Sequence, residues 1–172
     1  LALVMYAAFR PEVGAMQFTE TASWIPAFGV GYRLGVDGIS LWMVLLTAFL
    51  TPLAILGSWK DIQRRVKGFY VSMLLLETAM LGVFVALDMF LFYVFWEVML
   101  IPMALLIGVW GGERRIYAAV KFFLYTMAGS VLMLVAMLVM VYLNYKSTGV
   151  LTFGYQELNR LGLPGDVQWW LF

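Results

Sequence analysis

The feature that most constrains this chain is a long apolar segment with one carboxylate inside it. Residues 89–96 are all apolar or aromatic, Glu97 follows them, and residues 98–110 carry no charge. A run of this length and composition spans a bilayer as a helix. An ionised carboxylate at that depth costs about 2.5 kcal/mol or more, so such residues face a protein interior or a water cavity. Two interpretations stay open: Glu97 lies on a proton pathway, or it is a protonated carboxyl that joins two helices.

The composition indicates a polytopic membrane protein. Of the 172 residues, 64% are hydrophobic and only 12% are charged, about half the share of charged residues in soluble domains. A net charge of +1 gives no basic surface for nucleic acid. The absence of cysteine and histidine excludes disulfides, thiolate-bound iron–sulfur clusters and histidine-bound metals. Any proton relay must therefore use carboxyl, amine or hydroxyl groups and water.

Four segments are long and apolar enough to cross ~30 Å of hydrocarbon as helices. They run over residues 39–57, 69–87, 89–110 and 116–143. We expect residues 1–9 to be a helix end and residues 168–172 to start a further span. Because both ends are apolar, the sequence predicts a fragment of a longer protein. The predicted fold class is an all-α polytopic membrane protein, a transmembrane helix bundle in which residues 1–172 form a single domain.

The connections between the spans are polar. Asp37 directly precedes the first span and predicts an N-terminal helix cap. Asp88 predicts a tight turn between the second and third spans. Residues 10–35 and 144–167 predict long loops, the second with a short interfacial helix at 155–161.

Basic residues predict the orientation of the spans. The loops at 58–68 and 111–115 carry six Lys and Arg over short lengths, whereas the 10–35 and 144–167 loops carry four over far longer lengths. Short loops rich in Lys and Arg stay in the cytoplasm. We therefore expect the first pair of loops inside and the second pair outside.

Two glutamates are predicted near the middle of the membrane. Glu97 lies nine residues after Asp88 and Glu77 lies eleven residues before it, which places both about 13–17 Å from the outer end. Tyr93 shares the helix face of Glu97. Spacing alone leaves open whether the two carboxyls face each other and share a proton. The alternative for Glu77 is a protonated carboxyl bonded across helices.

Lys121 is the second candidate for proton translocation, after Glu97 and ahead of Glu77. It lies six residues past Arg115, about 9 Å inside the cytoplasmic end of its span. One interpretation is a long side chain that extends to the interface. The other is an intramembrane cation that exchanges protons with Glu97.

Four stretches carry a family resemblance. They are Trp24-Ile-Pro-Ala-Phe-Gly29, Gly35-Val-Asp-Gly-Ile-Ser-Leu41, Leu87-Asp-Met-Phe-Leu-Phe-Tyr-Val-Phe-Trp-Glu-Val-Met-Leu-Ile-Pro-Met103 and Lys121-Phe-Phe-Leu-Tyr-Thr126. In this order they resemble the M-type (chain 4) antiporter-like, proton-pumping membrane subunit of respiratory complex I, the NADH-quinone oxidoreductase. The resemblance implies a subunit of 14 helices, of which this chain holds the end of the second to the start of the seventh. It also implies that Glu97 is the family's essential glutamate, paired with a lysine that lies beyond Phe172.

The resemblance implies a translocase subunit that couples electron transfer in other subunits to proton transport. Glu97, Lys121 and Glu77 would carry the protons, and this chain would hold no cofactor. FMN, iron–sulfur clusters and quinone would bind other subunits. The partners would be L-type and N-type antiporter-like neighbours in a bacterial or mitochondrial inner membrane. The alternatives are a cation/proton antiporter or membrane-bound hydrogenase subunit of the same superfamily, and an inert membrane scaffold.

Overall fold

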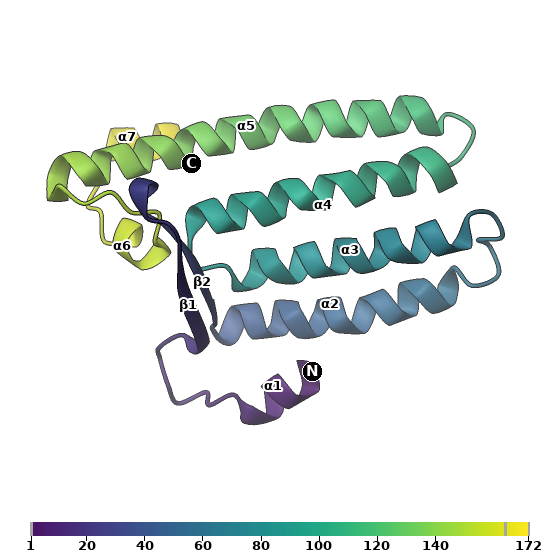
Figure 1. Ribbon diagram of the computed structural model, residues 1–172, viewed down its shortest axis with the longest axis horizontal. Coiled ribbons are helices and arrows are strands. Elements are labelled where there is room, and N and C mark those ends of the chain that lie inside the picture. Colours follow the sequence, from purple (N-terminus) through teal and green to yellow (C-terminus); the bar gives the residue numbers. More distant parts are fainter. Residues whose placement is uncertain (1, 164, 172) are drawn as a thin grey trace.

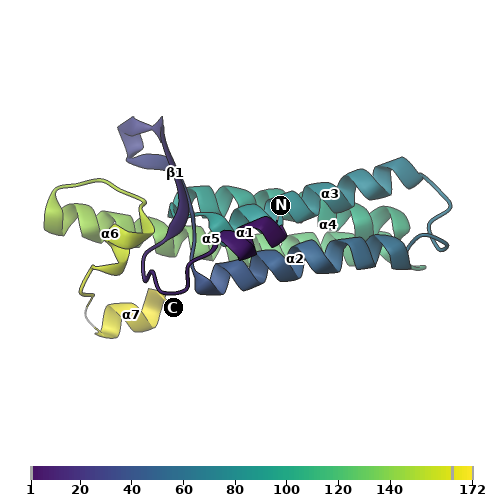
Figure 2. The same ribbon diagram turned by 90° about the horizontal axis from the view of Figure 1, so that it is seen from below.

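Four long helices form the body of the protein. The computed structural model describes residues 2–163 and 165–171. The helices are α2 (Gly38–Gly57), α3 (Val66–Val85), α4 (Met89–Trp110) and α5 (Arg115–Thr148). They lie side by side in chain order, so that α3 packs between α2 and α4, and α4 packs between α3 and α5 (Figures 1 and 2). Each is long and apolar enough to cross a membrane. The predicted fold class of a transmembrane helix bundle is confirmed.

The helix ends differ from the predicted spans by a few residues. Helices α2 and α4 begin at Gly38 and Met89, next to or at the predicted starts. Helix α3 begins three residues before the predicted start, and α5 extends to Thr148, five residues beyond the predicted end. These extra turns contain charged or polar residues, which a hydropathy pattern leaves out although the backbone continues to form hydrogen bonds.

The start of α2 is fixed by the N-terminal cap at Asp37 that the sequence predicted, and Ser40 completes it as a capping box. One carboxylate oxygen of Asp37 accepts hydrogen bonds from the backbone N–H groups of Ile39 at 3.1 Å and Ser40 at 2.7 Å. In return the backbone N–H of Asp37 donates to the Ser40 hydroxyl at 2.8 Å. The Ser40 N–H is the largest influence on the pKa of Asp37, which lies below its usual value. Two otherwise unpaired donors at the helix start are thereby satisfied.

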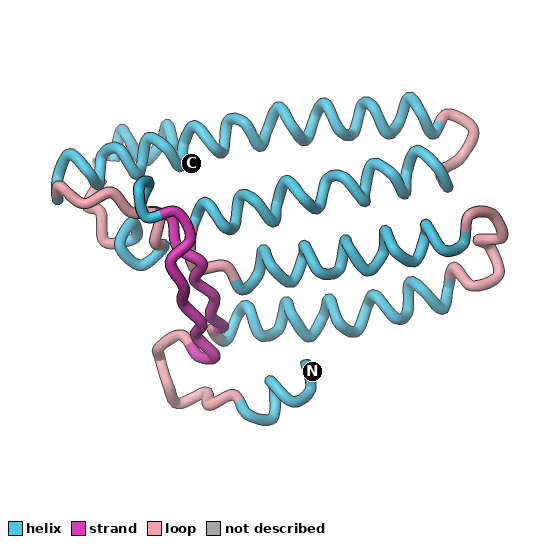
Figure 3. Tube along the Cα trace, viewed as in Figure 1, coloured by secondary structure: helices cyan, strands magenta, loops and turns pink. Residues whose placement is uncertain are grey.

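A β-hairpin covers one end of the bundle, where the sequence predicted only a loop. Strand β1 (Gln17–Ile25) pairs antiparallel with β2 (Val30–Val36), and the 3-10 turn η1 (Pro26–Phe28) joins them (Figure 3). Most of β1 is exposed, so its side chains show no apolar face that would mark a strand. The turn closes at Gly29, whose φ of +67° is a left-handed conformation that favours glycine.

The hairpin lies at the same end as the α3–α4 connection and the segment after α5. We call this the hairpin end, comprising residues 17–36, 86–88 and 149–163; the other end, the basic end, comprises residues 58–65 and 111–114 (Figure 1). At the hairpin end a small apolar core joins Val30, Val141, Phe153 and Leu158. The short helix α6 (Tyr155–Asn159) forms within the predicted 155–161 segment.

Two short helices occur near the chain ends. Helix α1 (Ala2–Ala8) falls in the predicted helix end at 1–9 and packs against α2. Helix α7 (Gly165–Leu171) begins three residues before the predicted start of a further span. Leu1 and Phe172, which those two predictions include, lie outside the described residues.

Candidate functional site

The candidate site lies in the middle of α4, at Glu97. This residue is eight positions after the start of α4 and thirteen before its end, so it is about 12 Å from the hairpin end and about 20 Å from the basic end. Its side chain is half-buried, and Oε1 is buried with no hydrogen-bond partner within the described part of the chain. An unpaired buried oxygen is unfavourable in apolar surroundings. The carboxyl is therefore placed to accept a proton or a donor from another group.

Two polar side chains, Tyr93 and Ser130, lie beside this carboxyl. Tyr93 lies one turn before Glu97 on α4, and its side chain interacts with the side chains of Glu97 and Ser130. Ser130 lies on α5, is only 3% exposed, and donates a hydrogen bond to the Met127 carbonyl at 3.0 Å. It is fifteen residues after the start of α5, about 22 Å from the basic end, which matches the depth of Glu97. Three polar side chains thus meet at mid-membrane depth between α4 and α5.

Glu77 does not take part in this cluster. A side chain at Gly82 of α3 would collide with the ring of Phe95, so Phe95 marks the side of α4 that contacts α3. Glu97 lies two residues further, about 200° around the helix from Phe95, and therefore points away from α3. Among the described residues no hydrogen bond or ion pair joins Glu77 to Glu97. The question that spacing left open is answered: the two carboxyls do not face each other.

Lys121 also lies apart from Glu97. It is exposed in the second turn of α5, and its Nζ is 5.8 Å from the centre of the Tyr117 ring. Its depth of about 9 Å from the basic end leaves roughly 10 Å along the bundle axis to Glu97. This distance is too long for direct proton transfer between the two side chains, so a relay would need intermediate groups or water.

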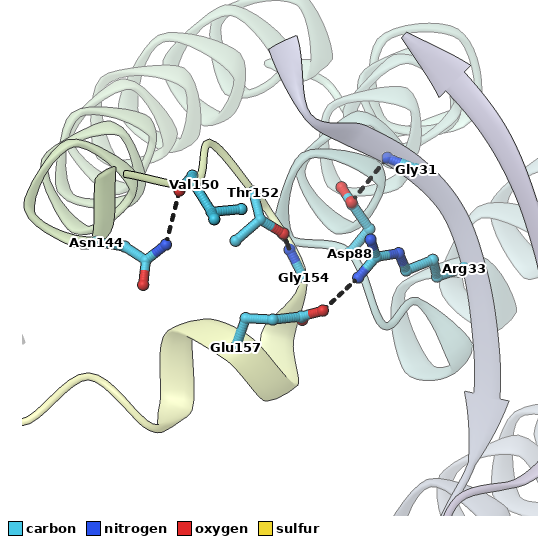
Figure 4. Close-up of polar contacts among 8 residues, drawn as sticks. All are labelled: Gly31, Arg33, Asp88, Asn144, Val150, Thr152, Gly154 and Glu157. Atoms are coloured by element: carbon cyan, nitrogen blue, oxygen red, sulfur yellow. Dashed lines mark hydrogen bonds and ion pairs between the residues drawn. The ribbon is translucent and has the colours of Figure 1, made fainter. Parts of the chain in front are cut away.

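Asp88 is more important to the structure than the predicted tight turn implied. It is 1% exposed, and its carboxylate accepts a hydrogen bond from the backbone N–H of Gly31 at 3.0 Å (Figure 4). It also accepts hydrogen bonds from the backbone N–H groups of Phe90 and Leu91 at 3.0 and 3.2 Å. Two of these donors start α4 and the third belongs to β2. The sequence offered one clue, an aspartate before an apolar helix, but its bond to the hairpin depends on a partner 57 positions away.

Other polar contacts complete the hairpin end. Arg33 and Glu157 form an ion pair at 3.0 Å, the Asn144 amide donates to the Val150 carbonyl at 3.0 Å, and the Gly154 N–H donates to the Thr152 hydroxyl at 3.1 Å (Figure 4). Backbone bridges join β2 to the α3–α4 connection and that connection to the segment before α6. These contacts join β2, the α3–α4 connection and the segment after α5 at the end of the bundle nearest Glu97.

The described part of the protein contains no evident metal-binding cluster. No group of three or more Asp and Glu side chains there is arranged to hold a metal ion. The chemistry that the described groups support is proton transfer at a carboxyl in apolar surroundings.

Comparison with known proteins identifies the family. Residues 86–165 match the model described as NADH:quinone oxidoreductase/Mrp antiporter, TM, and residues 13–87 match the model described as NADH-ubiquinone oxidoreductase chain 4, amino terminus. The chain is 51% identical over 180 residues to NADH-quinone oxidoreductase subunit M of Rhodobacter capsulatus, covering all of this chain and 34% of that protein. It is 42% identical to F(420)H(2) dehydrogenase subunit M of Methanosarcina mazei, covering 92% of this chain and 32% of that protein.

A solved structure agrees with these matches. Respiratory complex I from Thermus thermophilus with bound NADH contains a chain that superposes with a TM-score of 0.79 at 32% identity, covering 99% of this chain and 34% of that one. The chain thus spans about a third of the length of the relatives it matches. The chain belongs to the NADH:quinone oxidoreductase/Mrp antiporter family of membrane proteins, within its chain 4 (subunit M) group.

Proposed function

We propose that this chain is part of a proton-translocating membrane subunit of an NADH:quinone oxidoreductase. The observation that carries the proposal is Glu97, a carboxyl at mid-depth of a membrane-type helix with one oxygen buried and unpaired among the described residues. Intramembrane carboxyls of this kind serve proton relays. Support also comes from the 51% identity to a protein named NADH-quinone oxidoreductase subunit M.

In this proposal Glu97 gains and loses a proton as the charge of a neighbouring group changes. Lys121 is the second candidate and Glu77 the third. Lys121 lies nearer the basic end and would exchange protons with Glu97 through intermediate groups or water. Among the described residues no hydrogen bond or ion pair joins Glu77 to Glu97, so any part that Glu77 takes is separate from the α4–α5 cluster.

The orientation that follows places the basic end in the cytoplasm or matrix and the hairpin end outside. The support is the six Lys and Arg over residues 58–68 and 111–115, at and beside the basic end. Protons would then reach Glu97 from the basic end along α4 and α5. The single transmembrane domain formed by residues 1–172 would be one part of a 14-helix subunit in a bacterial or mitochondrial inner membrane.

Electron transfer belongs to other subunits in this proposal. FMN, iron–sulfur clusters and quinone would bind there, since this chain has no Cys or His to ligate a redox metal. L-type and N-type antiporter-like subunits would be the neighbours in the membrane. Energy would arrive as electrostatic and conformational coupling through them.

The proposed function is tested with membrane vesicles that contain the complete complex. NADH and a quinone are added, and acidification of the vesicle lumen is followed with a pH-sensitive dye, with and without an uncoupler. Acidification that depends on NADH and collapses with the uncoupler supports the proposal. Proton movement driven only by a sodium gradient would support the cation/proton antiporter instead, and no proton movement under either condition would support the scaffold.

A second candidate keeps the proton transport but changes the electron donor. The 42% identity to a subunit named for F(420)H(2) dehydrogenase shows that similar chains occur in complexes with another donor. In the same vesicles, acidification with reduced F420 in place of NADH would favour this candidate.

A further inference from the structure

We propose that Tyr93 and Ser130 are positioning residues for Glu97: their two hydroxyls form a hydrogen-bonded pair that holds the carboxyl against α5 and reverses its donor direction when Glu97 gains or loses a proton. The inference rests on the proposed role of Glu97 as a proton carrier. It goes further by naming the two groups that keep the carboxyl hydrogen-bonded in both of its protonation states.

The first support is the geometry of the cluster. Tyr93 and Glu97 lie one turn apart on the side of α4 that points away from α3, and Ser130 is a buried residue of α5, which packs against α4. The Tyr93 side chain lies between the two and interacts with both. Ser130 is 3% exposed, which leaves its hydroxyl only nearby protein groups as partners. Glu97 and Ser130 lie about 20 and 22 Å from the basic end, and Tyr93 lies one helical turn nearer the hairpin end. The contact lies within the packed α4–α5 pair. All three residues of the cluster therefore belong to these two helices.

The second support is the number of donors and acceptors. Each hydroxyl has one proton to donate and can also accept a hydrogen bond. When Glu97 is ionised, the Tyr93 hydroxyl donates to the carboxylate and the Ser130 hydroxyl donates to the Tyr93 oxygen. When Glu97 is protonated, the acid O–H donates to the Tyr93 oxygen and the Tyr93 O–H donates to the Ser130 oxygen.

The Met127 carbonyl makes the second arrangement possible. The Ser130 hydroxyl donates to this carbonyl at 3.0 Å, so its proton has a partner when its oxygen accepts from Tyr93. The two arrangements differ by the one proton on Glu97 and by the rotation of two hydroxyls. Neither leaves a hydroxyl proton unpaired, and both leave Oε1 of Glu97 open for exchange with a further group. A carboxyl held in this way can change its charge without losing its partner on α5.

The test is infrared difference spectroscopy on the purified complete complex in lipid, recorded between alkaline and acid pH. The C=O stretching band of protonated Glu97 is identified as the band lost in Glu97→Gln. We expect Tyr93→Phe to move this band to higher wavenumber, because the protonated acid loses its acceptor. Ser130→Ala should move it in the same direction by less, and Ser130→Thr, which keeps the hydroxyl, should restore the wild-type position.

The matched control is Tyr142→Phe, since Tyr142 is a tyrosine of α5 that is 62% exposed. This variant should leave the band unchanged. A Glu97 band that stays in place in both Tyr93→Phe and Ser130→Ala would overturn the inference, as would the absence of any band that depends on Glu97. If Tyr93→Phe fails to assemble, the comparison of Ser130→Ala with Ser130→Thr decides by itself.

The spectroscopic result is independent of transport. A band shift in Tyr93→Phe together with unchanged pumping in Glu97→Gln would keep the hydroxyl pair and refute the proton-carrier role. An unshifted band together with lost pumping in Glu97→Gln would refute the pair and keep the carrier. The failure of the inference and the failure of the proposed function are thus distinguished.

Discussion

The carboxylate of Asp88 accepts a hydrogen bond from the backbone N–H of Gly31, 3.0 Å away, and this bond ties the β-hairpin to the start of α4. The same carboxylate caps α4 through Phe90 and Leu91. Since Glu97 lies nine residues further along the same helix, Asp88 also fixes the depth of the proposed proton carrier relative to the hairpin end.

Replacing Asp88 with Ala should release the hairpin. Three backbone donors in a site that is 1% exposed would lose their acceptor, and each unpaired buried donor costs about 1–3 kcal/mol. We expect faster amide hydrogen exchange at Gly31, Phe90 and Leu91 and less assembled complex. Asp61→Ala, at an exposed loop position, is the control. Unchanged exchange at Gly31 in Asp88→Ala would show that the hairpin is held by other contacts.

Gly82→Ala should disturb the α3–α4 contact. The added methyl group would collide with the Phe95 ring, and overpacking of this kind costs about 1–3 kcal/mol. The melting temperature of the purified complex should fall, and the second substitution Phe95→Leu should recover part of the loss. Gly57→Ala is the matched control, because a side chain there meets no atom within 4 Å. Equal melting temperatures for the two alanine variants would contradict this account of the contact.

Removal of the Asp37 cap should loosen the first turn of α2. Asp37→Ala leaves the N–H groups of Ile39 and Ser40 without their acceptor, at a cost of about 1 kcal/mol. Because the hydrogen bonds from Ser40 and Ile39 lower the pKa of Asp37, the cap is fully formed above about pH 4 and is lost as the pH falls through the lowered value. The loss of the cap is measured by amide hydrogen exchange at Ile39 and Ser40. If these two amides exchange in Asp37→Ala at the wild-type rate, the cap does not stabilise the first turn of α2.

The ion pair between Arg33 and Glu157 should contribute little. The two side chains are 35% and 47% exposed, and ion pairs of this kind contribute less than about 1 kcal/mol. A double-mutant cycle with Arg33→Met and Glu157→Gln should give a small coupling energy that decreases further at high salt. A large coupling that persists at high salt would mean that this pair, rather than Asp88, secures the hairpin end.

The helices and the central carboxyl could be predicted from the sequence because both depend on local patterns. Apolar runs of 20 residues and a capping aspartate act within one helix. The membrane spans, the position of Glu97 and the cap at Asp37 could therefore be predicted from the sequence. The hairpin was not, because β1 is exposed and shows no alternating apolar face. The role of Asp88 was also hidden, since its third donor lies 57 positions earlier in the chain.

The residues of the site also differ in whether local spacing predicts their arrangement. The shared helix face of Tyr93 and Glu97 follows from their spacing on α4. The contribution of Ser130, and the separation of Glu77 from Glu97, depend on the rotation of neighbouring helices about their axes. That rotation is set by contacts such as Gly82 with Phe95, which no pattern within one helix determines.

The most direct test of the central claim is the number of protons transported per electron by the purified complete complex in proteoliposomes, with wild type compared to Glu97→Gln. Glu97→Asp, which keeps the carboxyl, is the matched control. The account predicts that Glu97→Gln assembles and still passes electrons but transports fewer protons per electron, while Glu97→Asp keeps more of the wild-type ratio. A ratio in Glu97→Gln equal to that of wild type would contradict the account and leave Glu97 as a structural group.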